Sequence, residues 1–179
     1  ILRALDARTG DLVWSFEAEA PSVNGALINW FEGNVAIAPS GQLIVPNDNF
    51  AIYAIDRNAG TRDWKWLMND QTWSLPAIDA STGKVFLGNN YIAPLDAVGV
   101  FFKNVFALDK DGQQLWRQGV QASIAASPTL VGDKVVMGAF DGYVRAFAQA
   151  DGSEKYAVPT LDHVYASPAL LPNGDLVQP

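Results

Sequence analysis

Cysteine is absent from the 179-residue sequence, and both charge and long hydrophobic runs are scarce. The absence of cysteine excludes disulfide bonds, thiolate catalysis and Cys-ligated zinc. No apolar run reaches the roughly 18 residues of a membrane-spanning helix. Lys and Arg number 12 against 19 Asp and Glu, so the formal net charge is −7. This balance argues against nucleic acid as a partner, because phosphate binding requires clustered basic side chains.

The remaining composition is that of a globular protein, with 49% hydrophobic and 17% charged residues. A chain of this length buries about 70% of its unfolded surface, which suffices for a core without disulfides or metals. The length favours one domain. The sequence opens without an initiator Met and ends within an expected strand at residues 177–179. We therefore interpret it as a segment of a longer protein, in which any targeting signal would lie outside these residues.

An eleven-residue pattern, Ala-x-Asp-x-x-x-Gly-x-x-x-Trp, recurs along the chain. Its copies lie at residues 4–14, 54–64, 107–116 and 146–156, the third one residue shorter and the fourth more degenerate. The aromatic residues that end the copies are 50, 52 and 40 residues apart: Trp14, Trp64, Trp116 and Tyr156. A second element containing Ser and Pro recurs out of phase with the first, at residues 74–77, 127–130 and 167–170. Such a periodic pattern indicates a repeat architecture.

Each repeat consists of short expected strands separated by turn residues. Residues 134–138 and 143–147 are predicted strands, joined by a tight turn at Asp141 and Gly142. The Gly of the Asp-x-x-x-Gly element suits a further turn, because glycine adopts a left-handed conformation at little cost. No window shows a sustained helical period. Four strands in each 40–50 residues predict an all-β fold, a β-propeller segment of four-stranded antiparallel blades.

The recurring pattern resembles the tryptophan-docking motif of the quinoprotein alcohol dehydrogenase-like propellers, whose units are called PQQ-like repeats. In that family the motif forms the two outer strands of a blade, and the Ser-Pro element opens the innermost strand of the next. The resemblance implies an outer hairpin in residues 1–16, full blades in 17–66, 67–117 and 118–157, and the start of another blade in 158–179. Rings of the family have about seven or eight blades, so about half a ring is expected. The alternative is that the two incomplete ends combine within the chain and close a small ring.

The four motif aromatics are interpreted as structural docking residues. A large flat ring can pack across to the neighbouring blade while an indole N–H donates to the backbone there. Recurrence in every repeat favours this packing role over ligand binding. The motif glycines belong to the same docking element: Gly10, Gly60, Gly112 and Gly152.

The resemblance also raises the question of a cofactor. Dehydrogenases of this family bind pyrroloquinoline quinone with calcium, held by an Asn of one blade and an Asp of the next that is also the expected base. Asn89 ends a predicted strand, precedes an insertion and resembles that metal-ligand Asn. The start of the following blade, residues 119–128, contains no Asp or Glu, so both a hard-cation ligand and a base are missing. We interpret Asn89 as a turn residue and predict no catalytic residue and no cofactor. A half-ring of a quinone- and calcium-dependent dehydrogenase, with its carboxylate elsewhere, is the alternative.

Three further polar features are interpreted as structural. Residues 109–112 match the start of a calcium loop without its later ligands, and residues 47–49 form an oxygen-rich turn. His163 is the only histidine, and it lacks a nearby Ser nucleophile or a second His. It is therefore expected to be a surface or packing residue.

Aromatic and apolar residues outside the motif occur at positions 30–31, 66–68, 73 and 101–102. They are expected to cover the longer loops, and the alternative is that they anchor a partner. The leading functional hypothesis is a non-catalytic binding or scaffolding module whose loops on one face engage a protein or a surface polymer. The resemblance implies the bacterial periplasm or cell surface, where one member of the family is a scaffold of outer-membrane assembly.

Overall fold

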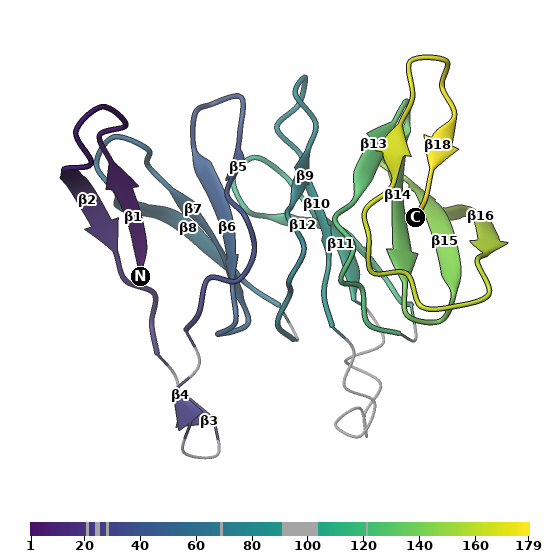
Figure 1. The fold of residues 1–179 in the computed structure, drawn as a ribbon, viewed down its shortest axis with the longest axis horizontal. Coiled ribbons are helices and arrows are strands. Elements are labelled where there is room, and N and C mark those ends of the chain that lie inside the picture. The colour runs from purple at the N-terminus through teal and green to yellow at the C-terminus, as the bar shows by residue number, and fades with distance from the viewer. Residues whose placement is uncertain (21, 24–25, 28, 69, 91–103, 121) are drawn as a thin grey trace.

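The computed structural model describes residues 1–179 except 21, 24–25, 28, 69, 91–103 and 121 (Figure 1). In the segment 21–28 the side chains are also outside the description. The described residues form strands and turns, with no helix among them. The expected aromatic pair Phe101 and Phe102 lies outside the described residues.

Three four-stranded antiparallel sheets follow one another along the chain, each with its strands in sequence order. The first contains β5 (Ala36–Ile37), β6 (Leu43–Asn47), β7 (Ala51–Ile55) and β8 (Arg62–Leu67). The second contains β9 (Ala77–Ile78), β10 (Val85–Gly88), β11 (Val105–Leu108) and β12 (Gln114–Gln118). The third contains β13 (Thr129–Val131), β14 (Lys134–Ala139), β15 (Tyr143–Ala148) and β16 (Glu154–Pro159).

Three two-stranded hairpins complete the described structure. They are β1 (Leu2–Leu5) with β2 (Leu12–Phe16), β3 (Ser22–Val23) with β4 (Ala26–Leu27), and β17 (Ala169–Leu170) with β18 (Leu176–Val177). The β1–β2 and β17–β18 hairpins lie at opposite ends of the row of sheets (Figure 1). They do not pair with each other within the chain. The division of the chain into blades at the boundaries given above stays a prediction.

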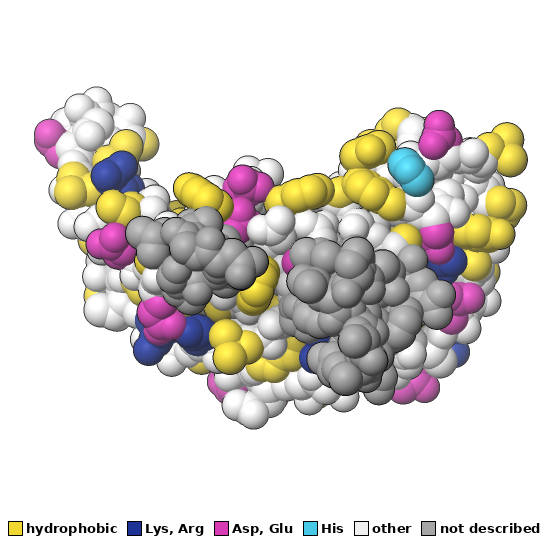
Figure 2. Space-filling view, turned by 90° about the horizontal axis from the view of Figure 1, so that it is seen from below, with side chains coloured by type: hydrophobic (Ala, Val, Ile, Leu, Met, Phe, Trp, Pro, Cys, Tyr) yellow, Lys and Arg dark blue, Asp and Glu magenta, His cyan; other side chains and the backbone are white. Residues whose placement is uncertain are grey.

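The sheets are arranged like the blades of a propeller. The first strands of successive sheets contact one another, β5 with β9, β9 with β13, and β13 with β17. The remaining strands of each sheet follow in order away from this inner row. Seen along the direction of the strands, the molecule has the outline of a crescent (Figure 2). The predicted all-β propeller segment is thereby confirmed.

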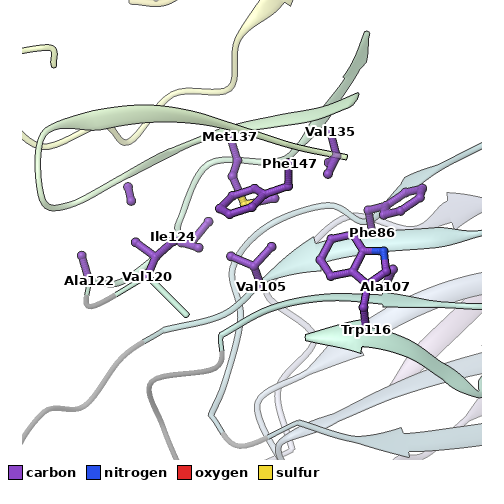
Figure 3. Packing of buried hydrophobic residues seen from close by; sticks show 11 residues of the cluster. Phe86, Val105, Ala107, Trp116, Val120, Ala122, Ile124, Val135, Met137 and Phe147 are labelled. Atoms are coloured by element: carbon purple, nitrogen blue, oxygen red, sulfur yellow. The ribbon is translucent and has the colours of Figure 1, made fainter. Parts of the chain in front are cut away.

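The hydrophobic core consists of layers between neighbouring sheets. Between the second and third sheets, Phe86, Trp116, Met137 and Phe147 pack together with residues of the connection such as Ile124 (Figure 3). Every residue of β7 is buried, because that strand has a neighbouring sheet on each of its faces. The period-2 alternation of a half-exposed strand is therefore absent there.

The motif turns have the conformation that their sequence predicts. Asp56 Oδ1 accepts hydrogen bonds from the backbone N–H groups of Asn58 at 2.8 Å and Ala59 at 2.7 Å. Gly60 closes the turn with φ of 68° and donates its N–H to the Asp56 carbonyl. A β-bulge after Ala54 places that residue opposite Trp64, and the other three copies of the motif carry a bulge at the same point.

Candidate functional site

Each motif tryptophan lies against the outer turn of the next sheet along the chain. The Nε1–H of Trp14 donates to the Arg57 carbonyl at 2.9 Å, that of Trp64 to Lys110 at 3.2 Å, and that of Trp116 to Gln149 at 3.0 Å. A Cβ atom at Gly60, Gly112 or Gly152 would come within 2.5–2.6 Å of the tryptophan ring that covers it. The glycines are therefore required both for the left-handed turn and for the close approach of the indole.

The two end members of the series have no such contact. Gly10 has no heavy atom within 4 Å of its Cβ position, although its φ of 79° matches those of the other motif glycines. Tyr156, which stands in the tryptophan position of the last copy, is 38% exposed. The assignment of all eight residues as docking elements stays a prediction, since these contacts do not measure what the residues contribute to stability.

The connections between sheets gather at one end of the strands, together with the β6–β7 and β14–β15 turns (Figure 1). We call this end the lower face, and Figure 2 views it directly. The hydrophobic side chains on it lie in several groups, and the histidine lies beside one of them (Figure 2). The candidate residues other than the docking elements lie mainly on this face.

Asn89 follows β10 on the lower face and is fully buried. Its Nδ2 donates to the Asp70 carbonyl at 3.2 Å, and the N–H of Asn90 donates to the Gln71 carbonyl at 2.9 Å. The first sheet repeats this arrangement one unit earlier. There Asn47 Nδ2 donates to the Asn29 carbonyl at 2.9 Å, and the N–H of Asp48 donates to the Trp30 carbonyl at 2.9 Å. Because the pattern recurs, these asparagines hold the incoming connection against the end of the first and of the second sheet.

Asn104 extends this network and was not singled out by the sequence analysis. It is fully buried, and its Nδ2 donates to the carbonyls of Ala122 at 2.8 Å and Asn89 at 3.2 Å. Its Oδ1 accepts the N–H of Val120 at 2.9 Å. One side chain thus joins β10, β11 and the connection to the third sheet. Its position just before a predicted strand could have indicated a structural role for Asn104. Its hydrogen-bond partners, however, lie 15 to 18 residues away in the sequence.

Two aspartates on the lower face are also buried, which the sequence analysis did not predict. Asp48 is 3% exposed, and burial together with the charge of Glu32 raises its pKa to about 6. Asp70 is 1% exposed, and burial raises its pKa as well, although the N–H of Gln71 donates to its Oδ1. Their exposure depends on the packing of the connections, which the sequence pattern does not reveal.

The surroundings of Asn89 do not fit a calcium–quinone site. Its side-chain amide is directed at the backbone of Asp70, in the same way as Asn47 is directed at Asn29. In the described part of the chain, no three His, Cys, Asp or Glu side chains come together as a metal site. Calcium takes about six to eight oxygen ligands, several of them carboxylates.

The two calcium-like sequences form ordinary turns. Asp109 Oδ1 accepts the backbone N–H groups of Asp111 at 2.9 Å and Gln113 at 2.8 Å. Asn47 Oδ1 accepts the N–H of Asn49 at 3.0 Å, and Asn49 Nδ2 donates to Glu19 and Tyr53. These oxygens stabilise the turns in which they lie.

An aromatic cluster lies on the lower face below the third sheet, formed by Phe140, His163 and Tyr165. The ring centroid of Phe140 lies 5.3 Å from that of His163, which stacks on it, and 4.5 Å from that of Tyr165. Tyr165 is 65% exposed, and the neighbouring Leu161 is 98% exposed with φ of 75°. His163 and Asp162 line two hollows, of about 360 and 420 Å³. Backbone strain of the kind seen at Leu161 tends to occur at functional sites, and Tyr rings such as that of Tyr165 are common anchors at protein interfaces.

The aromatic and apolar residues outside the motif divide into two groups, and two of them, Trp66 and Leu67, lie on strand β8. Phe31 packs on Phe16 and Tyr53, and Trp66 packs on Phe106 with Arg117 over its ring. Trp30, Leu67 and Trp73 are 44–62% exposed. Some of these side chains thus pack against the core, and the others add to the exposed apolar surface.

Comparison with known proteins relates the chain to one family. Residues 1–97 and 96–167 match a family model described as outer membrane protein assembly factor BamB. The outer membrane protein assembly factor BamB of Burkholderia pseudomallei (strain K96243) is 31% identical over 120 residues, which are 67% of this chain and 28% of that protein. The chain therefore spans less than a third of the length of this curated relative.

Solved structures with a similar fold include proteins of more than one kind. BamB from Moraxella catarrhalis superposes with a TM-score of 0.67 at 18% identity, over 91% of this chain and 45% of that one. The computationally designed Ika8 protein superposes with a TM-score of 0.67 at 17% identity, over 97% of this chain and 50% of the Ika8 chain. Quinohemoprotein alcohol dehydrogenase from Comamonas testosteroni superposes with a TM-score of 0.61 at 19% identity, over 82% of this chain and 22% of the dehydrogenase chain. At these identities the likeness concerns the fold.

Proposed function

The chain belongs to the PQQ-like repeat family whose model is described as outer membrane protein assembly factor BamB, and we propose that it is a non-catalytic scaffold segment for outer-membrane protein assembly. Its role is to bind a protein partner through the lower face. The proposed role places the protein in the periplasm or on the cell surface.

One observation carries the proposal, the 31% identity to an outer membrane protein assembly factor over 67% of the chain. Two features of the lower face support the proposal. Apolar side chains are exposed on it, and buried hydrogen bonds fix the connections that carry them. No helix in the described part of the chain is long and apolar enough to cross a membrane.

The dehydrogenase alternative is not favoured by the residues present. Residues 119–128 provide no carboxylate, and Asn89 repeats the backbone contact of Asn47. An alcohol dehydrogenase needs a base positioned against its substrate. Because one propeller fold serves unrelated activities, the resemblance in fold to a dehydrogenase adds nothing to this alternative.

The aromatic cluster and Leu161 form the proposed centre of the binding face. Binding energy at protein interfaces concentrates in a few aromatic and apolar anchors that are surrounded by polar residues. Phe140 supports the rings of His163 and Tyr165 from below, and Asp141 and Asp162 flank the same hollow of about 360 Å³. Because Asp141 is already ion-paired with Arg145 at 2.6 Å, the face suits a partner with an apolar strip and a basic side chain that reaches Asp162.

The test is the affinity of the purified chain for immobilised components of a bacterial outer-membrane protein assembly machinery, measured by surface plasmon resonance. We expect saturable binding and a loss of about tenfold or more for each of Leu161→Asp and Tyr165→Asp. The matched control is Ile37→Asp on β5, a strand residue that is 67% exposed and lies outside the lower face. It should bind like the wild type.

Absence of saturable binding by the wild-type chain would overturn the proposal. An equal loss for Ile37→Asp and Leu161→Asp would overturn the assignment of the lower face. Circular dichroism spectra of all variants, compared with the wild type, establish that the fold is retained.

A further inference from the structure

The connection into the first sheet is held on the lower face by the turn between β6 and β7. Asn47 Nδ2 donates to the Asn29 carbonyl at 2.9 Å. The N–H of Asp48 donates to the Trp30 carbonyl, also at 2.9 Å. The seating of residues 29–32 on this sheet therefore depends in part on the conformation of the turn.

The residue whose N–H holds the connection differs from sheet to sheet. In the second sheet it is Asn90, which donates to the Gln71 carbonyl at 2.9 Å. In the third sheet it is Phe140, which donates to the Ser123 carbonyl at 3.0 Å. A neutral side chain thus occupies this position in two sheets, whereas Asp48 occupies it in the first. The fold does not require an ionisable group there, so the carboxyl of Asp48 calls for another explanation.

The carboxyl of Asp48 is buried near a second acidic residue. Asp48 is 3% exposed, and its Oδ1 has no hydrogen-bond partner. A buried carboxylate is unfavourable unless donors or an opposite charge replace its hydration. Glu32, an exposed residue of the connection, adds a charge of the same sign, and residues 21–28 before it contain no charged residue. Burial together with the charge of Glu32 raises the pKa of Asp48 from its ordinary 3.8 to about 6. The buried position thus favours the neutral carboxyl.

Two cations near the turn, Arg62 and Lys65 of β8, already have an anionic partner. Both pair with the carboxylate of Glu19. The Nζ of Lys65 also lies 5.9 Å from the ring centroid of Tyr53. The Glu19 carbonyl and the Tyr53 hydroxyl accept hydrogen bonds from Asn49 Nδ2 at 2.8 and 2.6 Å, so this charged group lies beside the turn. Its two cations are matched by their own anion and leave the buried carboxyl without a positive partner.

We propose that Asp48 and Glu32 form a proton-controlled latch for the connection at residues 29–32. While Asp48 is neutral, its carboxyl stays buried and the connection is seated on the first sheet. When Asp48 gives its proton to water, the carboxylate gains hydration and distance from Glu32 if the connection moves away, so the open position becomes more populated. Trp30, whose side chain is 56% exposed, moves with the connection. The latch thus makes one part of the lower face respond to pH.

Amide hydrogen exchange of the full chain, followed by NMR spectroscopy and corrected for intrinsic exchange rates, tests the latch. The probe is the N–H of Asp48, which is bonded to the connection. Its protection should be about tenfold lower at pH 7.5 than at pH 5, because the closed position keeps the proton up to about pH 6 and the open position up to about pH 4. The equivalent N–H of Phe140 is the internal control and should keep the same protection at both pH values.

Three variants separate the latch from other effects of pH. Asp48→Asn provides the neutral residue that the second sheet has at this position, so the protection of residue 48 should be the same at both pH values. Glu32→Gln, at an exposed residue, should reduce the difference without abolishing it. Asp63→Asn, which removes an exposed carboxyl from β8 of the same sheet, is the matched control and should keep the tenfold difference.

Equal protection of the Asp48 N–H at the two pH values in the wild type would overturn the proposal. A difference that persists unchanged in Asp48→Asn would do the same, because another group would then be its cause. A change of equal size at Phe140 would also overturn the latch, since it would show that the whole molecule opens and not one connection. The measurements use the chain without a partner, so their outcome is independent of the proposed scaffold function.

Discussion

The tryptophans of the motif illustrate how one residue type can set the geometry of a repeat protein. Each indole covers a glycine in the next sheet and donates to a carbonyl two to three residues before that glycine. Contacts made once per sheet can hold a row of sheets at a constant spacing, because stability in repeat proteins comes largely from neighbouring units.

Trp64 provides a direct measure of this contribution. Trp64→Ala should lower the free energy of unfolding by about 3–5 kcal/mol, because it leaves a cavity over Gly112 and removes the hydrogen bond to Lys110. The measurement is a urea titration followed by tryptophan-independent circular dichroism. Trp30→Ala, at a tryptophan that is 56% exposed, is the control and should cost under about 1 kcal/mol. Similar losses for the two variants would show that the motif tryptophan is not a docking residue.

Asp48 makes stability depend on pH. Its pKa rises from 3.8 to about 6 on folding, so the folded state binds more protons than the unfolded state between these values. Stability therefore falls as pH increases from about 4 to about 6 and stays reduced above that range. Asp48→Asn should raise the free energy of unfolding at pH 8 by up to about 2 kcal/mol and leave it nearly unchanged at pH 3.5.

Urea titrations at the two pH values measure this difference for Asp48. Glu32→Gln should produce part of the same gain at pH 8, because the charge of Glu32 contributes to the raised pKa of Asp48. A gain for Asp48→Asn that is equal at both pH values would contradict a titrating carboxyl as its cause.

At the scale of elements, the polar residues at the strand ends decide how the connections are held. Asn47 and Asn89 make the same contact in successive sheets, and Asn104 adds three hydrogen bonds in the second sheet. The position after β10 thus resembles a metal-ligand position in sequence, while its hydrogen bonds are those of a structural link.

Asn104→Ala should lower the free energy of unfolding by about 2–3 kcal/mol, because it leaves the N–H of Val120 and the carbonyl of Ala122 without this partner, while the Asn89 carbonyl still accepts the N–H of Ile124. Hydrogen exchange should show the largest loss of protection at residues 120 and 122–124. Asn173→Ala, in the exposed turn before β18, is the matched control, with an expected change under about 0.5 kcal/mol. A loss no larger than that of the control would show that the network contributes little.

At the scale of the whole molecule, a PQQ-like fold does not by itself imply that the protein binds pyrroloquinoline quinone. Calorimetric titration of the chain with pyrroloquinoline quinone should give no calcium-dependent heat, because the site of Asn89 lacks the acidic partner residue. A quinone-dependent dehydrogenase is the positive control. Stoichiometric binding that requires calcium would contradict this expectation and would make Asn89 a ligand candidate again.

Much of the fold could be predicted from local signals in the sequence. The Asp56 turn and the strands on both sides of Asp141 follow from turn chemistry and motif spacing. The burial of Asp48 and Asp70 could not be predicted, because it depends on where the connections pass over the ends of the sheets. The aromatic cluster was also missed, since Phe140 and Tyr165 belong to different connections.

The sequence by itself determined the eleven-residue motif, its hairpin and the positions of the motif turns. These features depend on residues within about a dozen positions of one another, where alternation and turn preference act directly. Only the tertiary structure decided which glycine each tryptophan covers, and that Asn89 repeats the contact of Asn47. The tryptophan contacts join residues 33–46 positions apart, so they exist only after whole sheets have packed against one another.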